Sequence, residues 1–243
     1  MTGLKFYENK EVQKTMGETL RPGGLESTAR ALEFCNFGAG DKLLDLGCGK
    51  GRTIKYVKDN YHINMQGLDI SEELVREARE LNKNSLITIS SGDHTPFEND
   101  EFQGVFAECT LSLMDNLENT INEINRIMKT RGYLVISDVY AKNTQYLNEL
   151  STYNIDTCLK RPHNMEVLTK LLKSRGFIIM LHENHDEYIM QLIADIIFTF
   201  GSMEDFFSRA GENCIDGKKF QDLVKKTKIG YFLMIAQKEA DFA

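Results

Sequence analysis

Short apolar runs alternate along the chain with segments whose apolar residues recur at helical spacing. An apolar run of about four to eight residues between turn-forming residues is typical of a buried strand, whereas apolar spacing of three and four is typical of a helix. The runs that predict strands cover residues 41–47, 63–70, 86–93, 102–109, 133–140, 177–183 and 229–239. This alternation predicts an α/β fold with a mostly parallel sheet and helices on both faces.

The segments between these runs carry signals for helix starts and ends. Ser71 and Asn164 are of the residue types that cap helix N-termini, and each precedes a segment of helical spacing. Gly176 follows the apolar stripe of residues 165–175 and is expected to end that helix. Residues 1–40 are expected to form N-terminal helices.

The last two predicted strands are separated by a long helical segment, residues 184–228. Its most apolar part, residues 188–200, is too short to span a membrane. The sixth strand is expected to run parallel to the first five, so this segment starts at the sheet edge where α/β proteins bind ligands. We therefore expect it to be a lid over a small acceptor molecule. We therefore predict a single domain over residues 1–243. Its parts are the N-terminal helices (1–40), a cofactor-binding core (41–183), the lid insertion (184–228), and the last strand and tail (229–243).

Composition narrows the class of protein. The 243 residues are 42% hydrophobic and 27% charged, with a formal net charge of -7, which favours a globular protein and argues against a nucleic-acid partner. The sequence contains neither a membrane-spanning apolar run nor a secretory signal pattern. The odd number of cysteines, without a paired motif, argues against a disulfide framework and favours a cytoplasmic location. These cysteines are Cys35, Cys48, Cys109, Cys158 and Cys214.

A glycine-rich loop follows the first predicted strand, in the sequence LLDLGCGKG (43–51). A phosphate-binding loop of the G-x-x-x-x-G-K-[ST] type is excluded, because Gly51 and Arg52 follow Lys50. The dinucleotide pattern G-x-G-x-x-G fails as well, since its third glycine position is Arg52. Asp45, just before the loop, would also repel a pyrophosphate.

A cationic ligand without phosphate fits the same residues better. S-adenosylmethionine carries a sulfonium and an α-amino group, and Asp45 is suitably charged for them. Asp69 ends the second predicted strand and is placed to hold ribose hydroxyls. Asp93 follows the third strand and could accept a hydrogen bond from the adenine amino group, and Glu108 ends the fourth strand beside the same cleft.

Three motifs in order carry a family resemblance, namely LLDLGCGKGRT, GLDIS and SGDHTPFENDEFQGVFAE. Over residues 41–138 the chain resembles the class I S-adenosylmethionine-dependent methyltransferases. The resemblance implies a Rossmann-like, seven-stranded sheet with an antiparallel last strand, S-adenosyl-L-methionine as cofactor and S-adenosyl-L-homocysteine as product. By motif position it implies cofactor contacts from Asp45, Gly47, Gly49, Asp69, Ile70, Asp93, His94 and Glu108, and we add the loop residue Cys48.

We therefore expect an enzyme that transfers a methyl group to a small-molecule acceptor, with no metal and no membrane partner. A homodimer is compatible with the sequence. Two other classes remain open: a non-catalytic protein that senses S-adenosylmethionine or binds a partner, and an NAD-dependent oxidoreductase.

The residues that act on the acceptor are less well defined. The sequence SDVYA followed by Cys158 resembles the arsenite-methylating branch of methyltransferases, with Cys214 as a second thiol, which leaves metalloid methylation as a further alternative. Other candidates for a general base or a pocket wall are His163, His182, His185 and Tyr140.

Overall fold

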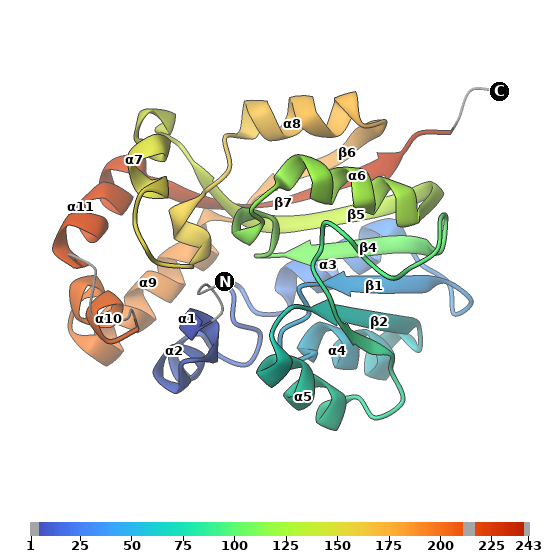
Figure 1. The fold of residues 1–243 in the computed structure, drawn as a ribbon, viewed down its shortest axis with the longest axis horizontal. Helices are drawn as coiled ribbons and strands as arrows, with labels where there is room; N and C mark the ends of the chain where they lie inside the picture. Colours follow the sequence, from blue (N-terminus) through green and yellow to red (C-terminus); the bar gives the residue numbers. More distant parts are fainter. Residues whose placement is uncertain (1–4, 211–216, 241–243) are drawn as a thin grey trace.

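The computed structural model describes residues 5–210 and 217–240, and its centre is one seven-stranded sheet (Figure 1). The strand order is β3-β2-β1-β4-β5-β7-β6. The strands are β1 (Lys42–Leu46), β2 (Asn64–Asp69), β3 (Ile87–Ile89), β4 (Phe102–Glu108), β5 (Met128–Ala141), β6 (Phe177–Asn184) and β7 (Ile229–Lys238).

The last strand runs against the rest of the sheet. Strand β7 is inserted between β5 and β6 and pairs antiparallel with both, with Ser137 opposite Leu233 on one side and Glu183 opposite the same residue on the other. The pairings among β1 to β5 are parallel. The expected Rossmann-like sheet with an antiparallel last strand is therefore confirmed.

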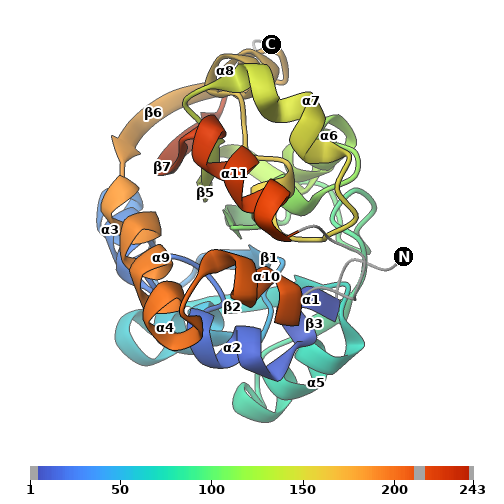
Figure 2. The same ribbon diagram turned by 90° about the vertical axis from the view of Figure 1, so that its left-hand side faces the viewer.

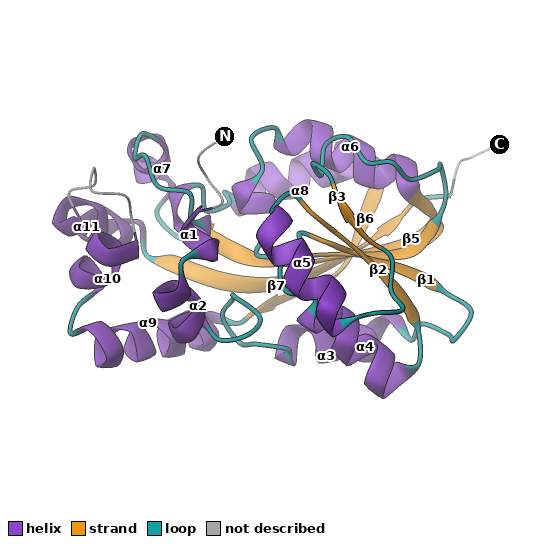
Figure 3. Ribbon diagram, turned by 60° about the horizontal axis from the view of Figure 1, so that its bottom comes forward, coloured by secondary structure: helices purple, strands orange, loops and turns teal. Residues whose placement is uncertain are grey.

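Helices cover both faces of this sheet (Figures 1 and 3). The helices are α1 (Lys5–Glu8), α2 (Lys10–Met16), α3 (Glu26–Cys35), α4 (Arg52–Tyr61), α5 (Glu72–Leu81), α6 (Leu117–Ile127), α7 (Leu147–Ser151), α8 (Met165–Ser174), α9 (Asp186–Phe200), α10 (Met203–Ala210) and α11 (Gly217–Thr227). One apolar core contains Ile121 of α6 and Leu172 of α8. The core on the opposite face contains Leu32 of α3, Ile54 of α4 and Val75 of α5.

The predicted caps are confirmed, and two strand boundaries differ from the prediction. Ser71 Oγ accepts a hydrogen bond from Leu74 N, and Asn164 caps α8. Strand β3 ends at Ile89 rather than continuing to residue 93, because Ser90 Oγ donates to His94 O and closes a turn. Strand β5 begins earlier than predicted, at Met128, which leaves the helical conformation and pairs with Phe102.

Helices α9 and α10, which follow β6, lie beside the N-terminal helices, and α11 packs against α10 and α7 (Figure 2). Phe206 of α10 lies edge-on to Phe6, with the ring centroids 5.9 Å apart, and Phe207 meets Phe220 of α11 at 4.8 Å. These side chains form a separate apolar cluster that supports the N-terminal helices. No helix in the described ranges is long and apolar enough to cross a membrane.

Candidate functional site

The glycine loop turns sharply between β1 and α4. Its first two amides, from Gly47 and Cys48, donate to Leu68 O at 2.7 and 3.0 Å, which ties the loop to strand β2. Gly47 has φ +76°, and a Cβ built there would lie 2.3 Å from Thr110 Oγ1. Only glycine therefore fits this position, because both the backbone conformation and the neighbour exclude a side chain.

Asp69 at the end of β2 holds the next part of the loop. Its Oδ2 accepts from Gly49 N at 2.8 Å, and its Oδ1 accepts from Ser71 N at 2.9 Å. Burial raises the pKa of Asp69, and these backbone donors oppose the shift without cancelling it. The amides of Gly49, Ser71 and Ile70 leave about one of the four acceptor positions of this carboxylate free, so Asp69 can still accept a hydrogen bond from a ligand.

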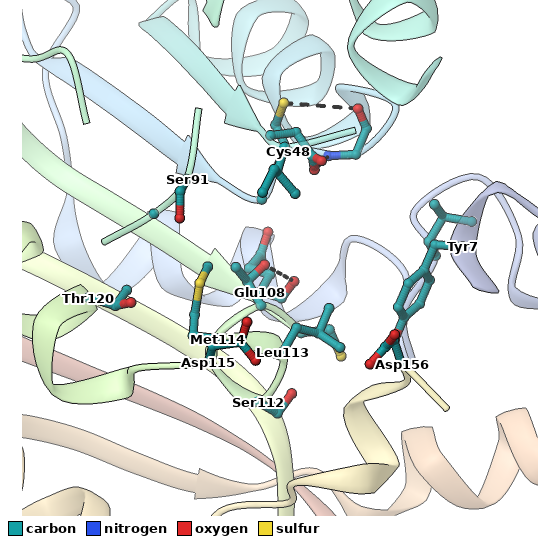
Figure 4. Close-up of a pocket in the computed structure, with 18 of the residues that line it drawn as sticks. Tyr7, Cys48, Ser91, Glu108, Ser112, Leu113, Met114, Asp115, Thr120 and Asp156 are labelled. Atoms are coloured by element: carbon teal, nitrogen blue, oxygen red, sulfur yellow. Dashed lines mark hydrogen bonds between the residues drawn. The ribbon is translucent and has the colours of Figure 1, made fainter. Parts of the chain in front are cut away.

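A cavity of about 450 Å³ opens in front of the loop (Figure 4). This volume is in the range of small-molecule sites. The predicted cofactor residues on its wall are Gly47, Cys48, Gly49, Asp69, Ile70, Asp93 and Glu108. Ile70 is 41% exposed and is suitably placed to pack against a flat ring, and a Cβ built on Gly49 meets nothing closer than 3.8 Å. The loop therefore leaves room for a ligand close to its backbone.

Glu108 lies on this wall, but its carboxylate is already bound by protein groups. Arg21 Nη2 lies 2.9 Å from Glu108 Oε2, and the hydroxyls of Thr28 and Thr53 donate to the same carboxylate at 2.8 and 3.1 Å. Arg21 Nη2 also donates to both hydroxyls. Glu108 thus joins the N-terminal segment to the sheet, a role that its motif position does not reveal.

Asp45 lies behind the cavity wall rather than on it. The residue is 3% exposed and is absent from the lining of the cavity. Burial raises its pKa well above the usual range, Glu108 and Asp69 raise it further, and Arg21 opposes them. Any contribution of Asp45 to a bound cation would therefore be electrostatic and transmitted from behind the loop.

The two residues predicted at the adenine end behave differently. Asp93 lies on the cavity wall, where Ser91 Oγ donates to its Oδ1. His94 is exposed and lies outside the lining. Its backbone shapes the turn, because His94 N donates to Ser91 O and His94 O accepts from Ser90 Oγ. A side-chain role for His94 is not supported by this placement.

The structure does not bring the predicted catalytic residues into the cavity. His182 is exposed on β6 and packs against Phe232, whereas His185 is buried beside Ser27, 3.2 Å from its Oγ. Tyr140 Oη accepts from Asn184 at the far side of the sheet end. None of these three residues lines the cavity.

Cys158 is buried just behind the cavity, and its neighbour is another cysteine. Its thiol hydrogen-bonds with that of Cys109, which lowers the pKa of Cys158 and raises that of Cys109. Cys214 lies outside the described residues. No cluster of three or more metal-ligating residues occurs in the described part of the chain.

Sequence reasoning missed several residues that line the cavity. Tyr7 from α1 lies on the wall, and its hydroxyl accepts from Cys158 N at 3.1 Å. Further wall residues come from the segments after β4 and α7, among them Ser112, Thr120, Asp156 and Arg161. None of the described residues between 184 and 228 lines the cavity, so the insertion lies one layer behind it. Its role as a lid stays a prediction.

Comparison with known proteins agrees with this geometry. Residues 44–136 match the family model described as "Methyltransferase domain". A phosphoethanolamine N-methyltransferase of Zea mays is 24% identical over 211 residues, which are 85% of this chain and 41% of that protein. The chain thus spans between 35% and 53% of the length of the curated relatives it matches.

Solved structures of similar fold cover nearly the whole chain. A putative sarcosine dimethylglycine methyltransferase from Galdieria sulphuraria superimposes with a TM-score of 0.70 at 14% identity, covering 97% of this chain and 96% of that one. Phosphoethanolamine N-methyltransferase 2 of Haemonchus contortus, in complex with S-adenosyl-L-methionine, has a TM-score of 0.69 at 17% identity, covering 94% and 56%. Residues 44–136 thus match a methyltransferase domain, and the chain has the fold of the class I S-adenosylmethionine-dependent methyltransferases.

Proposed function

We propose that this chain binds S-adenosylmethionine in the cavity and catalyses transfer of its methyl group to a small-molecule acceptor. The observation that carries the proposal is the hydrogen bond from Gly49 N to Asp69, which holds the glycine loop open beside a cavity of about 450 Å³. When bound, the cofactor supplies an electrophilic methyl group on a sulfonium. The protein's task is then to align the acceptor and exclude water.

The residues at one end of the cavity suit this cofactor. Asp69 has an acceptor position left for a ribose hydroxyl, Ile70 offers an apolar surface for adenine, and Asp93 can accept from its amino group. Gly49 leaves open space beside the backbone. The acidic groups around the loop favour a cationic ligand over a pyrophosphate, which also argues against the NAD-dependent alternative.

Calorimetry with S-adenosylmethionine and S-adenosylhomocysteine tests the cofactor, with Asp69→Ala as the loss variant and exposed Asp59→Ala as its control. A product assay then follows S-adenosylhomocysteine formation with phosphoethanolamine and sarcosine, the compounds in the names of similar proteins. The proposal is supported if the wild type binds S-adenosylmethionine and turns over an acceptor, and if Asp69→Ala weakens the binding at least tenfold. Binding without turnover of any acceptor favours the non-catalytic sensor, and absence of binding overturns both.

Metalloid methylation is a second candidate, now favoured by a different pair of thiols from the one predicted. Cys109 and Cys158 hydrogen-bond to each other, and Cys109 lies on the cavity wall. Two thiols are soft ligands for a thiophilic ion. If the wild type methylates arsenite and Cys158→Ser removes that activity while S-adenosylmethionine still binds, this candidate stands. If the wild type does not methylate arsenite, it fails.

A homodimer and a reducing, cytoplasmic location complete the proposal. Helix α9 exposes Met190, Ile197 and Phe198, the last with 94% of its surface accessible, and such a patch is typical of a surface that another chain covers. Light scattering of the wild type and Phe198→Glu tests the dimer, which the substitution should weaken.

The buried cysteines in the described ranges are free, which supports a reducing compartment.

A further inference from the structure

Asp138 is a fully buried carboxylate whose hydrogen-bonding capacity is completely used. Its Oδ1 accepts from Ser112 Oγ at 2.7 Å and from Val139 N at 2.8 Å. Its Oδ2 accepts from Ser112 N at 3.0 Å and lies 3.3 Å from His163 Nε2. A carboxylate has about four acceptor positions, so Asp138 has none left for a ligand.

His163 holds Asp138 from the side opposite Ser112. Its backbone extends the edge of β5, because His163 N donates to Val139 O and His163 O accepts from Ala141 N, both at 2.9 Å. Its ring lies edge-on to Phe232. The imidazole is therefore fixed by both backbone and packing, and it can donate from Nε2 to the carboxylate.

Ser112 is the member of this group that lies on the cavity wall. It belongs to a short 3₁₀ turn, Leu111–Leu113, directly after β4 (Figure 4). Its single hydroxyl proton is donated to Asp138. Toward the cavity, Ser112 Oγ can thus offer only a lone pair, which the neighbouring anion makes a stronger acceptor.

Other hydroxyls around this half of the cavity have also donated their protons within the protein. Thr120 Oγ1 donates to Asn116 O at 3.0 Å, and Thr110 Oγ1 donates to Glu108 O at 3.2 Å. The cations here are matched by carboxylates, since Lys160 lies 3.5 Å from Asp156 and Arg161 lies 2.8 Å from Asp115. Ser112, Thr110 and Thr120 therefore present acceptor oxygens on this part of the wall, which suits a ligand that brings donors.

We propose that Ser112, fixed by Asp138 and His163, is a positioning residue that accepts a hydrogen bond from an N–H or O–H of the methyl acceptor. The assignment rests on the proposed methyltransferase function. It restricts the acceptor to a molecule with an amino or hydroxyl group at the reacting end. An acceptor without such a hydrogen would leave Ser112 Oγ unpaired in a largely buried site, which costs binding free energy.

The test compares ligands with and without the donor on the S-adenosylhomocysteine-saturated protein. The probes are phosphoethanolamine, with an ammonium group, 2-hydroxyethyl phosphate, with a hydroxyl, and phosphocholine, whose nitrogen has no hydrogen. We expect calorimetry to give at least one donor probe about tenfold tighter binding than phosphocholine, as for one buried hydrogen bond. The tighter of the two donor probes identifies the acceptor as an amine or an alcohol.

Substitutions separate the hydroxyl from the fold. Ser112→Ala should remove the roughly tenfold preference, whereas Ser112→Thr keeps a hydroxyl and should retain most of it. Ser151→Ala is the matched control, because Ser151 is exposed and donates only to Asn148 O in its own helix. S-adenosylhomocysteine affinity should be unchanged in all three variants, since Ser112 lies beyond the cofactor end.

Two results overturn the assignment. One is a wild type that binds S-adenosylhomocysteine but does not prefer a donor probe, including the case in which no probe binds. The other is an equal loss of preference in Ser112→Ala and Ser112→Thr, which would indicate packing rather than the hydroxyl. A wild type that fails to bind S-adenosylhomocysteine overturns the proposed function itself, and the assignment with it.

Discussion

Arg21 and Glu108 form a buried ion pair that joins the N-terminal segment to the carboxyl end of β4. Arg21 Nη2 lies 2.9 Å from Glu108 Oε2, and the two side chains are only 7% and 1% exposed. Burial alone would lower the pKa of Arg21, but Glu108, Tyr231 and Asp45 raise it overall, so the guanidinium stays charged. Both residues lie on the cavity wall, and the pair therefore holds the N-terminal segment against the site.

Breaking this pair should cost far more than breaking a surface pair. Arg21→Met leaves Glu108 buried without its cation, and we expect the free energy of unfolding to fall by about 3–5 kcal/mol. Lys55→Met, which removes the exposed pair with Asp59, should cost less than about 1 kcal/mol. Urea unfolding followed by circular dichroism measures both. Similar costs for the two variants would show that Arg21 is not a structural tie.

Substitution of Gly47 should mainly reduce stability, whereas substitution of Gly49 should mainly reduce ligand affinity. Gly47→Ala places a Cβ 2.3 Å from Thr110 Oγ1, so we expect a loss of stability of at least about 2 kcal/mol from overpacking and positive φ. Gly49→Ala meets no neighbour within 3.4 Å, so about 1 kcal/mol of backbone strain is expected, with a larger effect on ligand affinity.

Thermal unfolding and S-adenosylhomocysteine calorimetry on both glycine variants separate these effects. Thr110→Ala, added to Gly47→Ala, should recover part of the lost stability, because it removes the two closest contacts. Failure of this rescue would mean that backbone strain, and not Thr110, explains the requirement for Gly47.

The part of the cavity wall at the glycine loop was predictable because its signals are local. The glycines and Asp69 follow directly from strands whose apolar pattern is unambiguous, and parallel strands bring their carboxyl ends to one edge. Cap residues such as Ser71 and Asn164 were predictable for the same reason, since the capped amides lie within three residues.

The rest of the cavity wall depends on contacts between distant segments, which no short-range pattern encodes. Arg21 occupies an apparent loop, and only the folded chain brings it to Glu108. The prediction placed Glu108 against the cofactor, because its position at a strand end does not show that Arg21 and two threonines already bind it. The histidines near the end of β6 were considered for the cleft, but β7 separates β6 from β5 and moves that edge away.

Glu123 of α6 fastens the loop that carries Asp93. Its Oε1 accepts from Thr95 N and Thr95 Oγ1 at 2.8 and 2.6 Å, and Arg126 Nε donates to its Oε2 at 2.8 Å. Arg126, opposed by partial burial and helped by Thr95, lowers the pKa of Glu123 to about 2. Because the folded-state pKa lies below the unfolded value near 4.5, the carboxylate stabilises the fold above that unfolded value and stops doing so as the pH falls toward 2.

Glu123→Gln should therefore lower the free energy of unfolding by about 1–2 kcal/mol at pH 7, after allowance for solvent screening. This difference between variant and wild type should shrink between pH 4.5 and 2. Urea midpoints at pH 7, 5, 4 and 3 measure it. Glu166→Gln, at an exposed pair with Lys170, is the control and should change little. A difference that stays constant down to pH 3 would contradict the assignment to the Glu123 carboxylate.

The carboxylate of Asp45 should lower the stability of the fold and strengthen the binding of a cationic ligand. Burial, Glu108 and Asp69 raise its pKa, so the folded protein binds this proton more tightly than the unfolded chain does. Its ionisation therefore destabilises the fold increasingly as the pH rises from the unfolded value near 3.8 to the folded-state pKa, and the full penalty remains above that. Asp45→Asn should consequently be at least as stable as wild type at pH 8, with the advantage vanishing below pH 4.

The same substitution should weaken binding of a cation. We expect Asp45→Asn to reduce S-adenosylmethionine affinity about tenfold, and affinity for S-adenosylhomocysteine, which lacks the sulfonium charge, by less. Calorimetry of both ligands with wild type and variant measures these losses. Asp59→Asn on the surface of α4 is the control for charge alone. Equal losses for the two ligands would contradict an electrostatic role and indicate that Asp45 only shapes the loop.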